Sequence, residues 1–381
     1  MTDTLKVLIA DDSIVYRKLL SDIINQHNDI ELIGVAPHGG IALSKIELKK
    51  PDLVLLDIAM PEMDGLEIMK IIKQKYANTD VIFISGMNRE NAEITVKALE
   101  MGALDFIPKP QTDSPQNSIK ELTSALTPLL NLAKTRKYTR QAKNPSLRPI
   151  DSDKEGKTLF DREKPTVLKT VLKERTTTLK LAEKREIPKI DVIAIGVSTG
   201  GPNALNRIIP QLQADLPTPI FVVQHMPPTF TASLAERLNS ISGITVVEAQ
   251  AEMIIENATV YIAPGGRHMI VRKDSSGKFA IGITDSAPVH NCRPSVDVLF
   301  RSLAMIYGKN ILSVILTGMG SDGTLGVAAI RRQGGYCLIQ DEASSVVWGM
   351  PGAVMEAGDA DEILDLDLLS KRINDVVARS C

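Results

Sequence analysis

The first group able to do chemistry is a serine in a glycine-rich turn. Residues 195–201 read IGVSTGG, after the apolar run IDVIA and before the helical pattern PNALNRII. The segment lacks the lysine of a GxxxxGK[ST] phosphate loop and does not match the GxGxxG dinucleotide fingerprint. It does match G-x-S-x-G, in which a tight strand-to-helix turn exposes a serine nucleophile. Ser198 is therefore the candidate, and the helix N-terminus behind it favours developing negative charge. The motif alone is weak, and a plain glycine-rich turn is the alternative.

A nucleophilic serine needs a base, and the base needs an acceptor that orients it. His225 ends the apolar run PIFVVQH, and consecutive parallel strands usually lie side by side, so His225 should emerge beside Ser198. For the carboxylate we favour Asp322, in the glycine-rich segment ILTGMGSDG. Spacing alone leaves His268 and His290 open as the base. The order Ser, His, Asp differs from that of α/β-hydrolases, which predicts an unrelated hydrolase fold.

A second serine, Ser321, also lies near a glycine loop. The sequence after it shows a less clear helix N-terminus than the sequence after Ser198. We therefore do not expect Ser321 to be the nucleophile.

A second set of reactive groups lies at the ends of apolar runs near the N-terminus. Asp11 and Asp12 follow KVLIA, Asp57 ends DLVLLD, Ser85 ends DVIFIS, and Lys109 ends DFIPK. The carboxyl ends of parallel strands line one crevice, where ligands bind. Three carboxylates there repel one another without a cation, and their oxygens suit Mg²⁺. A carboxylate in such a site can attack a phosphoryl group and form an aspartyl phosphate.

The elements that position these groups form two α/β domains separated by a basic segment. Residues 4–125 and 188–381 each alternate apolar strand patterns with amphipathic helix patterns, which is typical of a parallel sheet covered on both faces. Residues 131–190 carry 11 Lys and 6 Arg against 3 Asp and 5 Glu, and aromatic residues nearly vanish. Such a composition offers too little apolar surface to offset its ordering entropy. We predict a flexible linker over residues 126–187, with nucleic-acid or acidic-lipid binding as the alternative role.

Composition excludes several other classes of protein. The net charge of −2 gives no reason to expect nucleic acid or an anionic membrane as a partner. The three cysteines are Cys292, Cys337 and Cys381; their odd number and wide spacing argue against a disulfide framework or a cysteine zinc site. No apolar run approaches the roughly 20 residues of a membrane span, and the first residues lack a signal-peptide pattern. We therefore expect a cytoplasmic protein without membrane insertion.

The N-terminal motifs IADDS, LLDIAMPEMDGLE, FIS and DFIPKP resemble the response-regulator receiver domain of two-component signalling. The resemblance implies a flavodoxin-like domain with a five-stranded parallel sheet over residues 4–125. It implies phosphorylation at Asp57, with Mg²⁺ held by Asp11, Asp12 and Asp57 and by the carbonyl of Ala59.

The same resemblance assigns the conformational switch of the receiver. Ser85 and Phe106 occupy the hydroxyl and aromatic switch positions, and Lys109 would pair with the phosphate. Phosphorylation draws the hydroxyl inward and repacks the aromatic ring, which changes the surface offered to a partner.

The C-terminal segments AIGVSTGGP, VVQHMPPTFTASLAERL, VYIAPGGRHM, NCRPSVDVLF, VILTGMGSDG and DEASSVVWGMP resemble the catalytic domain of the chemotaxis protein-glutamate methylesterases, the CheB family. The resemblance implies a doubly wound, mostly parallel α/β hydrolytic domain over residues 188–381. It implies Ser198 as nucleophile, His225 as general base and Asp322 as its partner. It also places the backbone amide of Met319 in the oxyanion hole, and it implies no cofactor in this domain.

The resemblance implies a phosphorylation-regulated serine hydrolase. Its substrates would be glutamate methyl esters on chemoreceptors, hydrolysed with release of methanol, and receptor glutamines would be deamidated at the same site. Its partners would be methylated chemoreceptors and the chemotaxis histidine kinase. Two alternatives remain open from the residues: a response regulator whose output is binding rather than catalysis, and an esterase acting on small metabolites.

Overall fold

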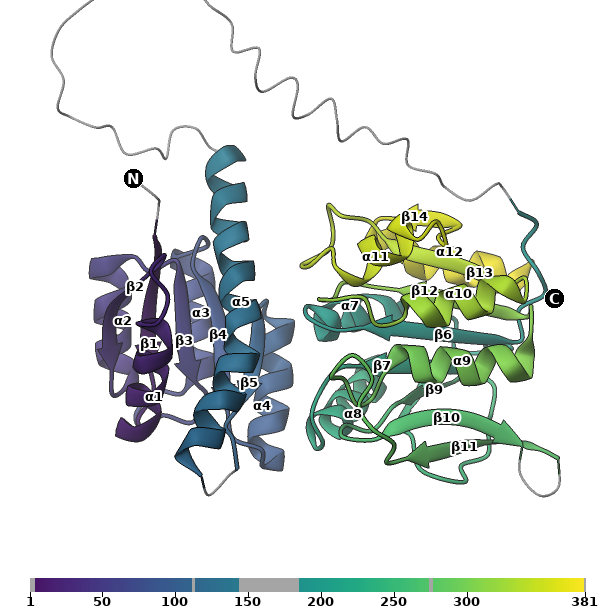
Figure 1. The fold of residues 1–381 in the computed structure, drawn as a ribbon, viewed down its shortest axis with the longest axis horizontal. Helices are drawn as coiled ribbons and strands as arrows, with labels where there is room; N and C mark the ends of the chain where they lie inside the picture. The colour runs from purple at the N-terminus through teal and green to yellow at the C-terminus, as the bar shows by residue number, and fades with distance from the viewer. Residues whose placement is uncertain (1–3, 112–113, 144–184, 274–276, 380–381) are drawn as a thin grey trace, which may run out of the picture.

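The structure is a computed structural model that describes residues 4–111, 114–143, 185–273 and 277–379. Two α/β domains lie side by side in it (Figure 1), one N-terminal and one C-terminal. Each is built around its own parallel sheet.

The N-terminal domain has a five-stranded parallel sheet in the order β2-β1-β3-β4-β5. Its strands are β1 (Leu5–Ala10), β2 (Ile30–Ala36), β3 (Leu53–Asp57), β4 (Asp80–Ser85) and β5 (Asp105–Pro108). Alternate side chains of β1 point to opposite faces: Leu8 packs toward helices α2 to α4, whereas Val7 and Ile9 pack toward α1 and α5. The helices are α1 (Ile14–Ile24), α2 (Gly39–Lys49), α3 (Gly65–Lys75), α4 (Arg89–Glu100) and α5 (Pro115–Lys143).

The C-terminal domain has a seven-stranded parallel sheet in the order β14-β13-β12-β6-β7-β9-β8. Its strands are β6 (Val192–Val197), β7 (Ile220–Gln224), β8 (Thr245–Glu248), β9 (Thr259–Ile262), β12 (Ile311–Ile315), β13 (Tyr336–Gln340) and β14 (Glu362–Leu364). The central strand β6 pairs with β7 on one side and β12 on the other. The three strands that precede Ser198, His225 and Asp322 are therefore neighbours.

Helices cover both faces of this sheet. Ile193 and Ile195 of β6 pack toward α7, α8 and α12, whereas Val192 and Ala194 pack toward α9, α10 and α11. These helices are α7 (Gly201–Ile208), α8 (Phe230–Ile241), α9 (Val296–Tyr307), α10 (Thr324–Arg332), α11 (Met350–Glu356) and α12 (Leu366–Ala378), with a short 3₁₀ helix η2 (Ile209–Gln211) after α7. The predicted fold class, a five-stranded receiver and a doubly wound, mostly parallel α/β domain, is confirmed.

The strands not recognised in the sequence are mostly at sheet edges. The edge strands β2, β8 and β14 carry partly exposed side chains, so they lack the continuous apolar runs of the central strands. The segment FAIGI, predicted as a strand, is β11 (Phe279–Thr284); it pairs with β10 (His268–Lys273) in an antiparallel hairpin outside the main sheet.

The linker prediction over residues 126–187 is wrong for its first part, and so is the domain boundary at residue 125. Helix α5 continues to Lys143, and one face of it is buried against the sheet through Leu126, Leu129, Leu130 and Ala133. These positions follow helical spacing, a pattern that the basic composition of the wider segment conceals. Of the remaining predicted linker residues, 144–184 lie outside the described residues, and 185–187 belong to no helix or strand. Across the part of the chain that the structure describes, no helix has both the length and the hydropathy of a membrane span.

The buried face of α5 can be tested with a pair of leucine substitutions. Leu130→Ala should lower the free energy of unfolding by about 2–5 kcal/mol, because it leaves a cavity in a close-packed core. Leu48→Ala is the matched control: Leu48 is 80% exposed, whereas Leu130 is 0% exposed. Its effect should stay within about 0.5 kcal/mol. Urea unfolding followed by circular dichroism measures both, and an equal loss in the two variants would show that α5 does not belong to the core.

Candidate active site

The turn that carries Ser198 is held by backbone contacts with the neighbouring strand end. The amide of Ser198 donates to the carbonyl oxygen of Thr317, 3.1 Å away, and its own carbonyl accepts from the amide of Gly201 at 2.7 Å. Gly200 caps α7 with φ of 78°, and a Cβ at this position would come within 2.6 Å of Val346. Only glycine fits this left-handed, crowded position. The geometry is the strand-turn-helix context that the G-x-S-x-G motif predicts.

Gln224, the last residue of β7, connects this turn to His225. Its side-chain Nε2 donates to the carbonyl oxygens of Ser198 at 3.1 Å and of His225 at 3.3 Å. Sequence reasoning missed Gln224. The available signal was one polar residue at the end of an otherwise apolar strand, which has to find a partner when it is buried.

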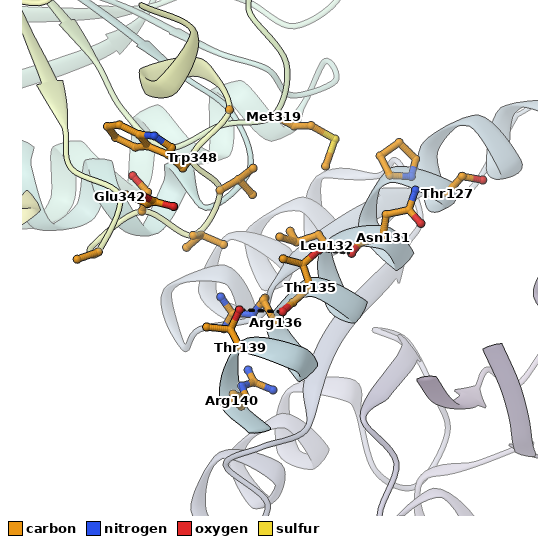
Figure 2. A pocket seen from close by; sticks show the side chains of 16 residues that line it. Thr127, Asn131, Leu132, Thr135, Arg136, Thr139, Arg140, Met319, Glu342 and Trp348 are labelled. Carbon is orange, nitrogen blue, oxygen red and sulfur yellow. Dashed lines mark hydrogen bonds between the residues drawn. The ribbon is translucent and has the colours of Figure 1, made fainter. Parts of the chain in front are cut away.

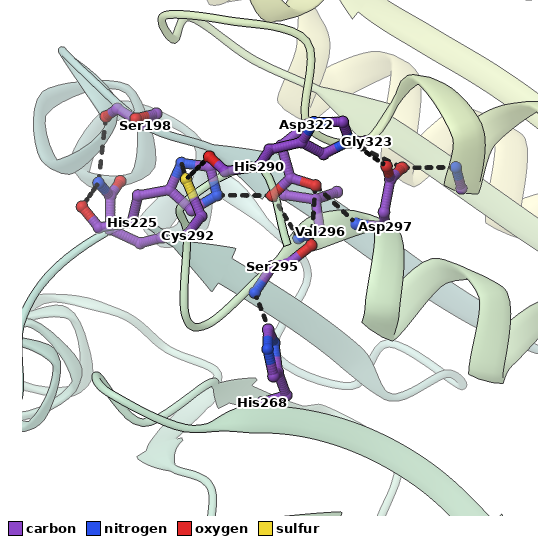
Figure 3. Close-up of polar contacts among 12 residues, drawn as sticks. Ser198, His225, His268, His290, Cys292, Ser295, Val296, Asp297, Asp322 and Gly323 are labelled. Atoms are coloured by element: carbon purple, nitrogen blue, oxygen red, sulfur yellow. Dashed lines mark hydrogen bonds and ion pairs between the residues drawn. The ribbon is translucent and has the colours of Figure 1, made fainter. Parts of the chain in front are cut away.

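Asp322 is a buried carboxylate surrounded by donors (Figure 3). Its Oδ2 lies 2.8 Å from His225 Nε2 and accepts from the amide of Val296 at 2.8 Å. Its Oδ1 accepts from Ser295 Oγ at 2.8 Å and from the amide of Asp297 at 3.0 Å. Burial by itself raises the pKa of Asp322, but the hydrogen bond and charge of His225 and the backbone amides outweigh it and lower the pKa. The carboxylate is therefore ionised and orients the imidazole.

Asp297 supports Asp322 from the other side. Its Oδ1 accepts from the amides of Gly323 at 3.1 Å and Gly326 at 2.6 Å, which ties the turn after Asp322 to α9. His290 Nε2 lies 3.2 Å from Asp297 Oδ2. Asp297 was not predicted, because nothing in its helical sequence pattern separates it from an ordinary N-terminal acidic residue.

The two rival histidines have other partners. His268 is fully buried, with Nε2 3.1 Å from the carbonyl oxygen of Ala287 and Nδ1 accepting from the amide of Ser295 at 3.1 Å. Both of its ring nitrogens are therefore used in holding the structure. His290 contacts Asp297 rather than Asp322.

His225 has one ring nitrogen, Nδ1, that does not face Asp322. Within the described residues, that nitrogen contacts the Cys292 sulfur at 3.7 Å, and the hydroxyl of Ser198 makes no hydrogen bond to it. Burial by itself lowers the pKa of His225, but the contacts with Asp322 and Cys292 raise it to about 9. The contact with Cys292 was not predicted from the sequence.

Met319, the predicted oxyanion residue, lies in the turn between β12 and Asp322. Its backbone amide makes no hydrogen bond among the described residues, so the donor is available to a ligand. Its side chain packs against the apolar cluster of α5 in the N-terminal domain.

The acidic groups of the N-terminal domain come together as predicted at the ends of β1 and β3. Lys109 Nζ lies 2.7 Å from Asp57 Oδ2 and 3.1 Å from Asp11 Oδ2. Asp11, Asp12 and Asp57 each offer a carboxylate oxygen within 4.8 Å of the others. Burial and the charge of Asp11 raise the pKa of Asp57 to about 6. Ala59 contributes an amide, which donates to Asp57 Oδ1 at 3.3 Å.

The two predicted switch residues, Ser85 and Phe106, contact groups other than Asp57. Ser85 Oγ lies 2.8 Å from Thr95 Oγ1 and donates to the carbonyl oxygen of Gly86 at 3.2 Å. Phe106 stacks on Phe230 of the C-terminal domain, with ring centroids 4.5 Å apart.

The N-terminal domain contacts the C-terminal domain beside the Ser198 turn. Helix α4 packs against α7 and α8. Among the residues that the structure describes, two ion pairs cross the interface: Arg89 with Glu236 at 2.9 Å and Arg237 with Glu100 at 2.7 Å. The Asp105 side chain lies against Thr199, and burial there raises the pKa of Asp105 to about 6.

A cavity of about 1170 Å³ lies between α5 and the loop that follows β13 (Figure 2). Its walls include Asn131 and Arg136 from α5 and Met319, Glu342 and Trp348 from the C-terminal domain. Met319 connects this cavity to the candidate active site, whereas Ser198 and His225 are not among the residues that line it.

The fold and these two sites define a class of protein in which a receiver domain is joined to an α/β domain with a hydrolase-type His–Asp pair. Residues 7–120 match the response regulator receiver domain family, and residues 193–373 match the CheB methylesterase family. The chain belongs to the CheB methylesterase family.

Two named relatives support this assignment over nearly the whole chain. The protein-glutamate methylesterase/protein-glutamine glutaminase of Trichodesmium erythraeum is 41% identical over 371 residues, which cover 97% of each chain. The protein of the same name from Desulfotalea psychrophila is 40% identical over 97% of each chain. The crystal structure of the Thermotoga maritima CheB methylesterase catalytic domain is 42% identical and covers 49% of this chain and 99% of that one, with a TM-score of 0.48.

The His225–Asp322 pair should make the stability of the chain depend on pH. The folded-state pKa of His225, about 9, lies above its ordinary value of 6.5. The free energy that protonated His225 contributes to the folded state is therefore fully present below about pH 6.5, and it is lost as the pH rises through about 9. Asp322→Asn should remove the part of this stabilisation that Asp322 supplies, while the contact with Cys292 keeps the rest. The gap in the free energy of unfolding between the two proteins should be about 1–3 kcal/mol at low pH and should shrink at high pH. Urea unfolding of both proteins at pH 6 and pH 10 measures this gap; a gap that does not change with pH would contradict the ion pair.

Proposed function

We propose that this chain is a receiver-controlled esterase that hydrolyses glutamate methyl esters on chemoreceptors and deamidates glutamines at the same site. Its curated relatives carry both activities in their names. The observation that carries the proposal for this chain is the 2.8 Å contact between His225 Nε2 and buried Asp322, next to the turn of Ser198. A non-catalytic binding output is not favoured by these relatives.

The reaction begins with attack of Ser198 Oγ on the ester carbonyl. In the neutral form of the ring, the serine proton passes to His225 Nδ1, because Nε2 is committed to Asp322. Asp322 stabilises the imidazolium that forms. The C–O bond to methanol then breaks as His225 returns the proton to the leaving oxygen. Water hydrolyses the acyl-serine by the same route, which leaves glutamate and the free hydroxyl. With an amide substrate, ammonia leaves in place of methanol.

The tetrahedral intermediate carries negative charge on the former carbonyl oxygen. The amide of Met319, which has no hydrogen-bond partner in the described part of the chain, is a donor for this oxyanion. The N-terminus of α7, directly after Ser198, adds a favourable dipole.

The acidic cluster of the receiver fits a hard divalent cation. Asp11 and Asp57 are buried, Lys109 is the side-chain cation that contacts them in the described part of the chain, and the three neighbouring carboxylates repel one another. Asp11, Asp12 and Asp57 would hold Mg²⁺, which supplies positive charge that offsets the carboxylates and the phosphoryl oxygens. Asp57 accepts the phosphoryl group, and Lys109, already 2.7 Å from it, pairs with the phosphate.

The receiver controls access to the esterase site. Before phosphorylation it packs beside the Ser198 turn, and Phe106 is held in a stack with Phe230. Phosphorylation of Asp57 draws Ser85 inward and releases Phe106 from that stack, which weakens the interface and exposes Ser198. The phosphate comes from a histidine kinase of the chemotaxis system, and the protein works in the cytoplasm on the receptors' cytoplasmic helices.

Substitution of the nucleophile tests the proposed reaction. Ser198→Ala should lower methanol release from methylated receptor membranes by about 10⁴-fold or more, because the acyl-enzyme cannot form. Ser321→Ala is the matched control, an exposed serine in the neighbouring glycine turn, and should keep the activity. Comparable losses of methanol release in both variants would contradict the assignment of Ser198 as the nucleophile. Faster hydrolysis of free small esters than of receptor membranes would favour the small-metabolite esterase.

A charge reversal at the interface tests the control by the receiver. Arg237→Glu should raise unstimulated methanol release about two- to fivefold, because it replaces an attraction to Glu100 by a repulsion. The double variant Arg237→Glu with Glu100→Arg restores the pair and should return the rate toward that of the natural chain. An unstimulated rate that stays the same in Arg237→Glu would contradict control by this interface.

Substitution of the phosphorylation site tests the signal itself. Asp57→Asn should remove stimulation of methanol release by a small phosphodonor. If the activity of Asp57→Asn still rose fully with the phosphodonor, phosphorylation of Asp57 would not control access to the esterase site.

A further inference from the structure

The imidazole of His225 contacts a second candidate nucleophile, Cys292, in addition to serving Ser198 in the proposed reaction. Asp322 holds Nε2 at 2.8 Å, so the ring cannot turn without breaking a buried hydrogen bond. The nitrogen left for proton transfer, Nδ1, lies 3.7 Å from the sulfur of Cys292 (Figure 3). Cys292, His225 and Asp322 therefore have the arrangement of a thiol, a base and an orienting carboxylate, the same arrangement that activates cysteine nucleophiles.

The backbone holds the thiol in this position. Val289 and Cys292 exchange two backbone hydrogen bonds, of 3.1 and 2.8 Å, across a tight turn. The two residues between them, His290 and Asn291, have φ of 50° and 60°. Left-handed backbone at two successive non-glycine residues persists only where the surroundings fix it. The thiol is thus presented by a constrained turn, and it remains partly exposed.

We propose that Cys292 is a modification site for peroxides, and that its oxidation stops the esterase; this last step rests on the proposed function. Transfer of the thiol proton to Nδ1 gives a thiolate beside an imidazolium. The thiolate sulfur attacks one oxygen of the peroxide, the O–O bond breaks, and the leaving hydroxide takes the imidazolium proton as water. Sulfur is oxidised to a sulfenic acid, the peroxide is reduced, and a thiol reductant reverses the change.

Oxidation blocks the reaction by geometry. A sulfenic oxygen on Cys292 would enter the space next to Nδ1, where the serine proton has to arrive. His225 would then hold a hydrogen bond with Cys292 rather than accept the proton of Ser198. Because Cys292 and Ser198 use the same base, His225, oxidation of Cys292 stops the reaction of Ser198.

Cys337 provides an internal control. It is fully buried in β13, and burial raises the pKa of its thiol to about 12. It has no imidazole partner among its described hydrogen bonds. If the chain reacted with thiol reagents in general, both cysteines would be modified. If the thiol of Cys292 is activated by His225, Cys292 alone should react quickly.

The experiment uses the full-length chain with Cys381→Ser, so that only Cys292 and Cys337 can react. Iodoacetamide at pH 7 should alkylate Cys292 at least about tenfold faster than Cys337, as followed by peptide mass spectrometry. His225→Gln should slow the reaction of Cys292 by about tenfold, because the imidazole no longer accepts its proton. Equal rates at the two cysteines, or no effect of His225→Gln, would overturn the proposal.

A second measurement follows activity. Hydrogen peroxide should remove most of the methanol release, and dithiothreitol should restore it. In the Cys292→Ser variant, the fraction of its own untreated rate that survives peroxide should be close to one. An equal fractional loss in that variant would overturn the proposed block. Absence of methanol release from every untreated protein would count against the proposed function, while the alkylation rates would still decide the modification site.

Discussion

A carboxylate is stable out of water only where donors surround it, and this requirement on Asp322 fixes the rest of the candidate active site. Three donors come from the start of α9, at Ser295, Val296 and Asp297, and the fourth is His225 at the end of β7. The helix N-terminus, the turn after β12 and the end of β7 must therefore meet at one point. The imidazole then has a single orientation, with one nitrogen left for chemistry.

The two domains balance the charge of their buried carboxylates in different ways. Each gathers acidic groups at the carboxyl ends of parallel strands, which lie along one edge of the sheet, where backbone amides are available. In the C-terminal domain a histidine and a helix N-terminus balance the carboxylate. In the receiver, Lys109 balances Asp57 and Asp11 only in part, which leaves the pKa of Asp57 raised to about 6. The first arrangement suits a fixed charge, whereas the second suits a site that gains a cation and a phosphoryl group.

The interface connects these two sites through packing rather than through long-range charge. Phe106 and Phe230 belong to one apolar cluster that continues from the receiver into the C-terminal domain. Because close-packed cores rearrange between discrete states, a movement of Phe106 cannot leave Phe230 undisturbed. Phe230 begins α8, a few residues after His225. A movement of Phe230 that follows a change in the receiver can therefore shift the nearby backbone of His225, the base.

The sequence by itself determined the two α/β domains and the neighbourhood of Ser198 and His225, because buried parallel strands are continuous apolar runs and consecutive strands usually pair. It did not reveal that α5 extends to Lys143, because a narrow apolar stripe is lost in an average basic composition. Nor did it reveal the partners of the site, Gln224, Cys292 and Asp297. Only the tertiary structure decided these, because their hydrogen bonds join residues far apart in the chain. Such contacts depend on which helix and loop come to lie over which strand end, and no local pattern encodes that.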